Sequence, residues 1–115
     1  MLVLFEMLEL RVIMNTACEE VFGFKTCCGL KANDLNLEVQ VVNRGDRPVV
    51  VPSCFDLETT DGVRRYDNLM PAGRHEIAPG EIKAFYCYMD PFVWVNARRL
   101  VMVDGDGQAH AAAIE

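Results

Sequence analysis

The chain has 115 residues, of which 51% are apolar and 24% are charged, and its formal net charge is −6. This length predicts one domain, residues 1–115, with a core large enough to fold without disulfide or metal staples. The composition is that of a globular protein rather than a disordered one. The acidic balance and the scattered basic residues argue against a nucleic-acid partner, because binding phosphates requires clustered Lys and Arg.

The N-terminal stretch from Met1 to Phe5 is apolar but short, and Glu6 follows it directly. It is too short to span a membrane, and no basic residue precedes it as in a secretory signal. We therefore expect no membrane partner. If Met1 is the native start, we expect a cytoplasmic protein.

Alternation of apolar and polar residues begins early in the chain. Leu8, Leu10, Val12 and Met14 share one parity, which predicts a strand over about residues 6–14. Residues 15–33 allow two interpretations. Thr16 to Glu19 match a capping box for a short helix, whereas the segment 21–27 has the β-branched and aromatic content of a strand. We favour a turn followed by a short strand.

The central part of the chain, residues 35–57, carries two strong alternating runs. The first has Leu35, Leu37, Val39 and Val41 on one face, and the second has Val49, Val51, Phe55 and Leu57. The segment 43–46 between them, Asn-Arg-Gly-Asp, supplies residues typical of turns. Within the second run, Pro52 and Ser53 predict a bulge or bend.

The remaining elements follow from turn residues. We expect, in order, a tight turn at 60–62, a polar edge strand at 63–66, a loop at 67–78, a strand at 82–89, a connection at 90–96, a strand at 100–103, a hairpin turn at 104–107 and a strand at 108–114. No segment has the length and pattern of an amphipathic helix. The pattern predicts an all-β fold, an immunoglobulin-like antiparallel β-sandwich of about seven strands.

Residues 35–89 also resemble a known group of proteins. The pattern N-x-G-D-x-P-V, F-x-L, D-G and P-G-E is similar to that of small bacterial immunoglobulin-like modules, found in lipoproteins and in the family named for an intracellular proteinase inhibitor. The matching positions are Asn43, Gly45, Asp46, Pro48, Val49, Phe55, Leu57, Asp61, Gly62, Pro79, Gly80 and Glu81. The resemblance implies the fold and a binding role. It implies no functional site, because every matched residue is a turn or core residue. The chain departs from the pattern in lacking a lipoprotein signal and in having five cysteines.

The cysteines provide an alternative function. Cys18, Cys27 and Cys28 are close in sequence, as a metal or redox module would require, and Cys54 and Cys87 stand alone. However, no C-x-x-C pair is present, and adjacent cysteines in a strand point to opposite faces. The odd count and the absent signal favour reduced thiols. We therefore expect no metal and no other cofactor, and keep the cysteine-based module as the alternative.

We also expect no enzymatic activity. The two histidines, His75 and His110, are not placed beside a thiol by any motif, so the sequence predicts no catalytic pair. The run Asp-Gly-Asp-Gly at 104–107 lacks the further ligands of a calcium loop and is explained by a hairpin turn.

The predicted function is that of a non-enzymatic module that binds a protein partner or assembles with itself. The first candidate surface is the connection holding Phe92, Val93, Trp94 and Val95, because connections are normally polar and Trp is enriched at interfaces. The alternative is that Phe92 and Trp94 fold back as a plug over the end of the core. The second candidate surface is the edge strand with Arg64 and Tyr66, which offers unpaired backbone groups to a partner strand.

Overall fold

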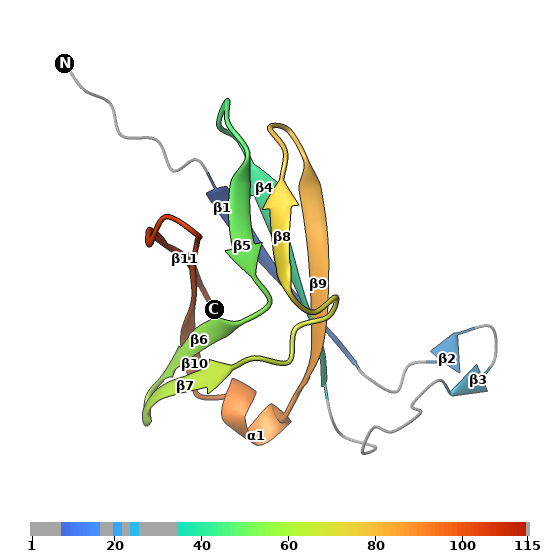
Figure 1. Cartoon of the computed structure of the whole chain (residues 1–115). Coiled ribbons are helices and arrows are strands. Elements are labelled where there is room, and N and C mark those ends of the chain that lie inside the picture. The colour runs from blue at the N-terminus through green and yellow to red at the C-terminus, as the bar shows by residue number, and fades with distance from the viewer. Residues whose placement is uncertain (1–7, 17–19, 22–23, 26–34, 115) are drawn as a thin grey trace.

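The structure is a computed structural model that describes residues 8–16, 20–21, 24–25 and 35–114. In this part of the chain almost all regular structure is β-strand, and every strand pair is antiparallel. The all-β prediction is confirmed. Two sheets face one another around a shared core in a sandwich-like arrangement (Figure 1).

The first sheet has three strands in the order β1 (Leu8–Thr16), β4 (Leu35–Asn43) and β9 (Ile82–Met89). Its register sets Leu10 opposite Val41 and Val39 opposite Phe85. Because side chains alternate between faces, these residues all point into the core. The parity expected from the sequence is confirmed here: Val39, Val41 and Phe85 are fully buried.

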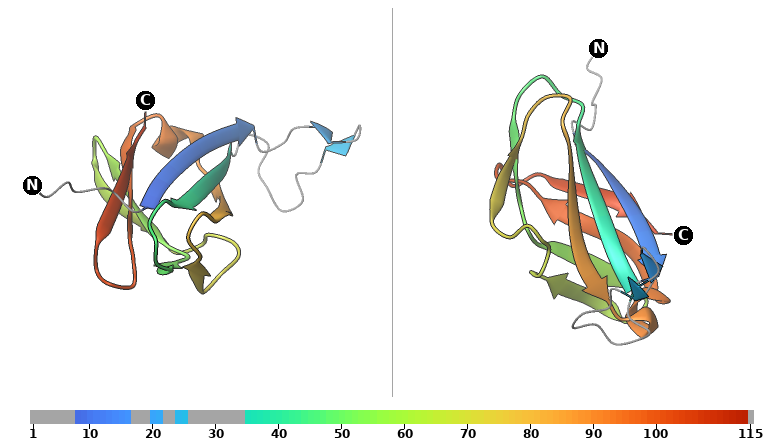
Figure 2. Two further views of the ribbon diagram at one scale, coloured as in Figure 1. Left: turned by 90° about the horizontal axis from the view of Figure 1, so that it is seen from above. Right: turned by 90° about the vertical axis from the view of Figure 1, so that its right-hand side faces the viewer.

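The second sheet has four strands in the order β11 (Ala109–Ala113), β10 (Ala97–Val103), β6 (Phe55–Thr59) and β7 (Gly62–Tyr66). Leu57 of β6 lies opposite Leu100 of β10, and both are fully buried. The β10–β11 hairpin turns at residues 104–108, as its glycines predict. Figure 2 shows the two sheets from above and from the side.

A separate two-stranded sheet pairs β5 (Val49–Pro52) with β8 (Arg74–Ile77). Two expectations need correction here. The single bent strand expected over 48–57 is two strands, β5 and β6, which belong to different sheets; Pro52, which has no N–H to donate, ends the first. The loop expected over 67–78 contains β8, which is anchored by the fully buried Ile77 opposite Val49.

Residues 15–33 are described only in part. The short strands β2 (Glu20–Val21) and β3 (Phe24–Lys25) pair with each other, so those four residues favour the strand interpretation over the helix. Cys18 and Glu19 of the expected capping box lie outside the described residues.

The core draws on the two larger sheets and on the β5–β8 strand pair. Its members are buried hydrophobic side chains: Leu8, Leu10, Leu37, Val39, Val41, Val49, Val51, Phe55, Leu57, Leu69, Ile77, Phe85, Cys87, Met89, Ala97, Leu100 and Met102. Burial of this apolar surface is the main stabilising term of the fold.

One buried polar residue, Asn43 at the end of β4, connects the turn that follows it to the end of β8. Its side-chain Nδ2 donates to the carbonyls of Arg47 and Ile77, both at 2.8 Å, and its Oδ1 accepts from the N–H of Gly45 at 2.9 Å. The Asn43 side chain thus caps the turn, as its residue type predicts. It also fastens that turn to the end of β8, which sequence spacing did not reveal.

Candidate interaction surfaces

The connection expected over 90–96 contains one helical turn, α1 (Pro91–Trp94). Asp90 caps it, since its Oδ1 accepts from the N–H of Phe92 at 2.8 Å. Pro91 occupies the first turn, where its fixed φ suits a helix and its missing N–H costs nothing. Aspartate followed by proline is thus a readable start signal, although the helix is too short for a periodic pattern.

The four apolar residues at α1 divide into two pairs. Val93 and Trp94 are half-buried and pack against the core. Phe92 and Val95 are 75% and 70% exposed. The plug is therefore formed by Val93 and Trp94, and Phe92 does not belong to it. One pair packs against the core while the other pair faces outward, and the binding role of the outward pair stays a prediction.

Trp94 also lines a groove at the seam between the two sheets. The groove has a volume of about 320 Å³, and its walls are Val12 and Met14 of β1, Trp94, Ala113 of β11 and Ile114. β1 and β11 are edge strands of different sheets, and in the described part of the chain no further strand pairs with either. The seam thus leaves apolar side chains of the core half-covered beside two strand edges.

The β7 edge predicted from sequence is confirmed as the last strand of its sheet. Its two candidate residues differ in character. Tyr66 is half-buried and stacks on Phe55 with ring centroids 5.1 Å apart, and burial raises the pKa of its hydroxyl. Arg64 is exposed and lies opposite the buried Leu57, so it sits on the core-facing side of an edge strand. Charges in that position protect an edge from unwanted pairing.

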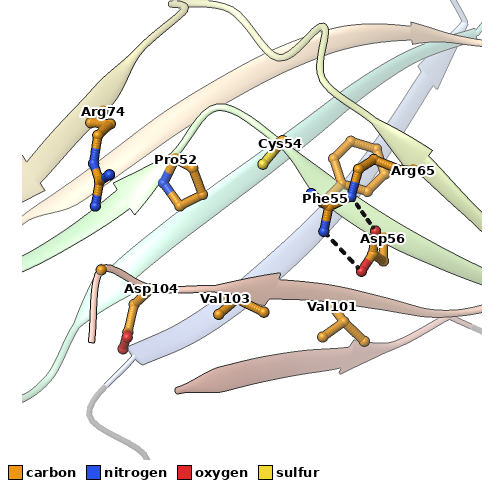
Figure 3. Close-up of a pocket in the computed structure, with 10 residues that line it drawn as sticks. Pro52, Cys54, Phe55, Asp56, Arg65, Arg74, Val101, Val103 and Asp104 are labelled. Carbon is orange, nitrogen blue, oxygen red and sulfur yellow. Dashed lines mark hydrogen bonds and ion pairs between the residues drawn. The ribbon is translucent and has the colours of Figure 1, made fainter. Parts of the chain in front are cut away.

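A pocket of about 330 Å³ lies where the β5–β8 strand pair meets the outer face of the second sheet (Figure 3). Val101, Val103 and Pro52 provide apolar surface, and Arg65 and Arg74 lie at different sides of it. Arg65 forms two hydrogen bonds with Asp56, at 3.0 and 3.4 Å. No motif in the sequence signalled this pocket, because its lining comes from four separate parts of the chain: residues 52–56, Arg65, Arg74 and residues 101–105.

A buried ionisable pair, Asp104 and His110, lies at the β10–β11 hairpin. His110 Nε2 is 2.8 Å from Asp104 Oδ2, and Asp104 Oδ1 accepts from the N–H groups of Asp106 and Gln108. Burial by itself raises the pKa of Asp104, but these hydrogen bonds outweigh burial, so the pKa lies below its usual value. Because Asp104 is ionised, His110 Nε2 is the donor. The other ring nitrogen of His110 is buried and has no partner among the described residues.

The cysteines divide between described and undescribed parts of the chain. Cys18, Cys27 and Cys28, on which the metal or redox alternative depends, lie outside the described residues. Cys54 is a half-buried free thiol, and burial raises the pKa of the Cys87 thiol to about 12. Within residues 8–16, 20–21, 24–25 and 35–114, no three His, Cys, Asp or Glu side chains converge on a metal-sized site. The same residues contain no helix long and apolar enough to cross a membrane.

Comparison with known proteins gives a likeness of fold. No family model matches the chain, and no curated protein matches it either. Among solved structures, the X-ray structure of Northeast Structural Genomics Consortium target SoR45 is similar over 98% of this chain and 85% of its own. The TM-score is 0.52 and the sequence identity is 11%. At this identity the likeness concerns the fold alone.

Proposed function

We propose that the chain is an immunoglobulin-like, non-enzymatic module that binds a protein partner or a second copy of itself. Strand order supports the fold: β1-β4-β9 corresponds to strands A-B-E of an immunoglobulin domain, and β11-β10-β6-β7 corresponds to G-F-C-C′. The Met70 segment, which bridges to Tyr86 on the outer side of β9, takes the place of strand D.

The single observation that carries the binding role is the exposure of Phe92 and Val95 on a fixed element. Asp90 and Pro91 hold the turn, and Val93 and Trp94 anchor it to the core. A large apolar residue on a rigid support suits binding, because little side-chain or backbone freedom is lost on contact. The seam groove beside Trp94 extends the apolar surface to the β1 and β11 edges.

The environments of the two histidines support the proposal that the module is not an enzyme. His75 Nε2 lies 3.0 Å from the carbonyl oxygens of Pro71 and Ala72, and its ring packs edge-on against Phe85. His110 is paired with Asp104 inside the hairpin. Each ring therefore has a structural role. A general base needs a ring nitrogen that reaches a substrate, so these contacts do not favour catalysis by either histidine.

The proposal is tested with the double variant Phe92→Ser, Val95→Ser. We expect near-native stability, because neither side chain is buried, together with weaker self-association in sedimentation velocity or weaker capture of a partner from the source cell. The matched control is Ile82→Ser, which removes a side chain that is 54% exposed at the start of β9, the end of that strand away from α1. If the double variant and the control associate as the wild type does, α1 is not the binding surface.

A further inference from the structure

We propose that the pocket in Figure 3 is a binding site for a carboxylate that carries a small branched apolar group, with Arg74 as the residue that recognises the carboxylate. This site is separate from α1 and shares no residue with it. The pocket volume of about 330 Å³ lies at the small end of the range for ligand sites.

Four charged side chains line the pocket, and three of them already have hydrogen-bond partners within the protein. Arg65 and Asp56 bond to each other, and Asp104 accepts three hydrogen bonds from the β10–β11 hairpin. Arg74 is the exception, because it forms no ion pair with any described carboxylate. Arg74 is solvent-exposed, and no described residue accepts a hydrogen bond from its guanidinium, so its planar set of donors can match a carboxylate in a two-pronged hydrogen bond.

Gly105 provides the space in which the Arg74 guanidinium lies. A Cβ at position 105 would be 3.3 Å from Nη2 of Arg74, which is tighter than an ordinary van der Waals contact. It would be 3.4 Å from Cβ of Val50, which is at the lower limit of such a contact. Position 105 has no left-handed backbone that would require glycine, whereas Gly107 has a φ of 85°. The missing side chain at 105 therefore serves close packing against Arg74, and its N–H is fixed to the carbonyl of Val50 at 2.8 Å.

The apolar group of the proposed ligand is inferred from the side chains that line the pocket between Arg65 and Arg74. Val101 and Val103 point outward from β10, and Pro52 adds a rigid ring beside them (Figure 3). Val103 is 39% exposed, so a branched aliphatic group would cover surface that now faces solvent. The lining charges balance overall, with Arg65 and Arg74 against Asp56 and Asp104. Recognition therefore rests on the free hydrogen-bond donors of Arg74 rather than on a broad positive field.

Two sources offer this chemistry, namely a free branched-chain carboxylic acid and the C-terminal carboxylate of a protein ending in valine. The probes are isovalerate, its neutral analogue isovaleramide, and a short acetylated peptide ending in valine as the free acid or as the amide. Binding is followed by NMR shifts of the pocket residues. A second readout is the alkylation rate of Cys54, which lines the pocket, measured by mass spectrometry with the buried Cys87 as reference.

We expect both acids to shift the pocket resonances and to slow alkylation of Cys54, and both amides to do neither. Arg74→Gln should weaken binding at least about tenfold, because a hydrogen-bonded charge is lost. Gly105→Ala should weaken it by displacing the guanidinium. The control Arg64→Gln removes an exposed arginine outside the pocket and should bind as the wild type does. Tighter binding of the peptide acid would identify a protein terminus as the source, and tighter binding of isovalerate would identify a small metabolite. Equal binding of acids and amides, or unchanged binding by Arg74→Gln, would overturn the proposal.

Discussion

Replacing Asn43 by alanine should destabilise the fold strongly, although Asn43 lies at the margin of the core and not among its hydrophobic residues. The variant loses three side-chain hydrogen bonds. The bond to the Ile77 carbonyl is buried, so that acceptor stays unsatisfied at a cost of about 1–3 kcal/mol. The bonds to Arg47 and Gly45 are part-buried, and water replaces them at a cost of about 0.5–1 kcal/mol each. The expected loss is about 2–5 kcal/mol of unfolding free energy.

The assay is equilibrium unfolding in urea followed by the fluorescence of Trp94, the single tryptophan of the chain. The midpoint should fall with an unchanged slope, because the surface exposed on unfolding hardly changes. The control is Gln40→Ala on the same strand, whose side chain bonds, among the described residues, only to Glu38; it should cost less than about 0.5 kcal/mol. Asn43→Asp should be at least as damaging as alanine, since a carboxylate cannot donate to the two carbonyls. A loss below about 1 kcal/mol for Asn43→Ala would refute the argument that this residue fastens the loops together.

Three further outcomes are expected. Trp94→Ala should lower the unfolding free energy by about 2–3 kcal/mol, less than for a fully buried aromatic, whereas Phe92→Ala should change it by less than about 0.5 kcal/mol; equal costs in thermal or urea unfolding would contradict the division of α1 into anchor and exposed pair. The pKa of Asp104 is lowered in the folded state, so its contribution to stability is complete above the unfolded value of about 3.9 and is lost as the pH falls through the lower folded value. Acid titration of stability should therefore show a smaller loss for Asp104→Asn than for the wild type, and identical curves would contradict this. The raised pKa of Cys87 keeps it a neutral thiol, so iodoacetamide should label it far more slowly than Cys54 until the protein unfolds; comparable rates in the folded protein would show that Cys87 is accessible.

Some features of the interaction surfaces were readable from sequence. Trp94 and its apolar neighbours were notable as an apolar run where a polar connection was expected, and the structure places two of them outward. The direction of each side chain was not readable, because it depends on the helical turn begun by Asp90 and Pro91. Arg64 was correctly placed on an exposed edge, but only pairing with β6 shows that it lies on the core-facing side, opposite Leu57.

What the sequence determined by itself is the β character of the chain and the burial of its alternating positions. Alternate residues of a strand point to opposite faces of any sheet, one facing solvent and one facing the core. The burial of Leu37, Val39 and Val41 could therefore be predicted without tertiary information. Tertiary structure alone decided which strands pair when they are distant in sequence. It placed β5 and β6, neighbours in sequence, in different sheets, and it made a strand of β8, whose polar residues conceal a single buried anchor at Ile77. It also brought Arg74 to Gly105, since that contact depends on long-range packing that no local pattern encodes, whereas Asp104 meets His110 within one hairpin.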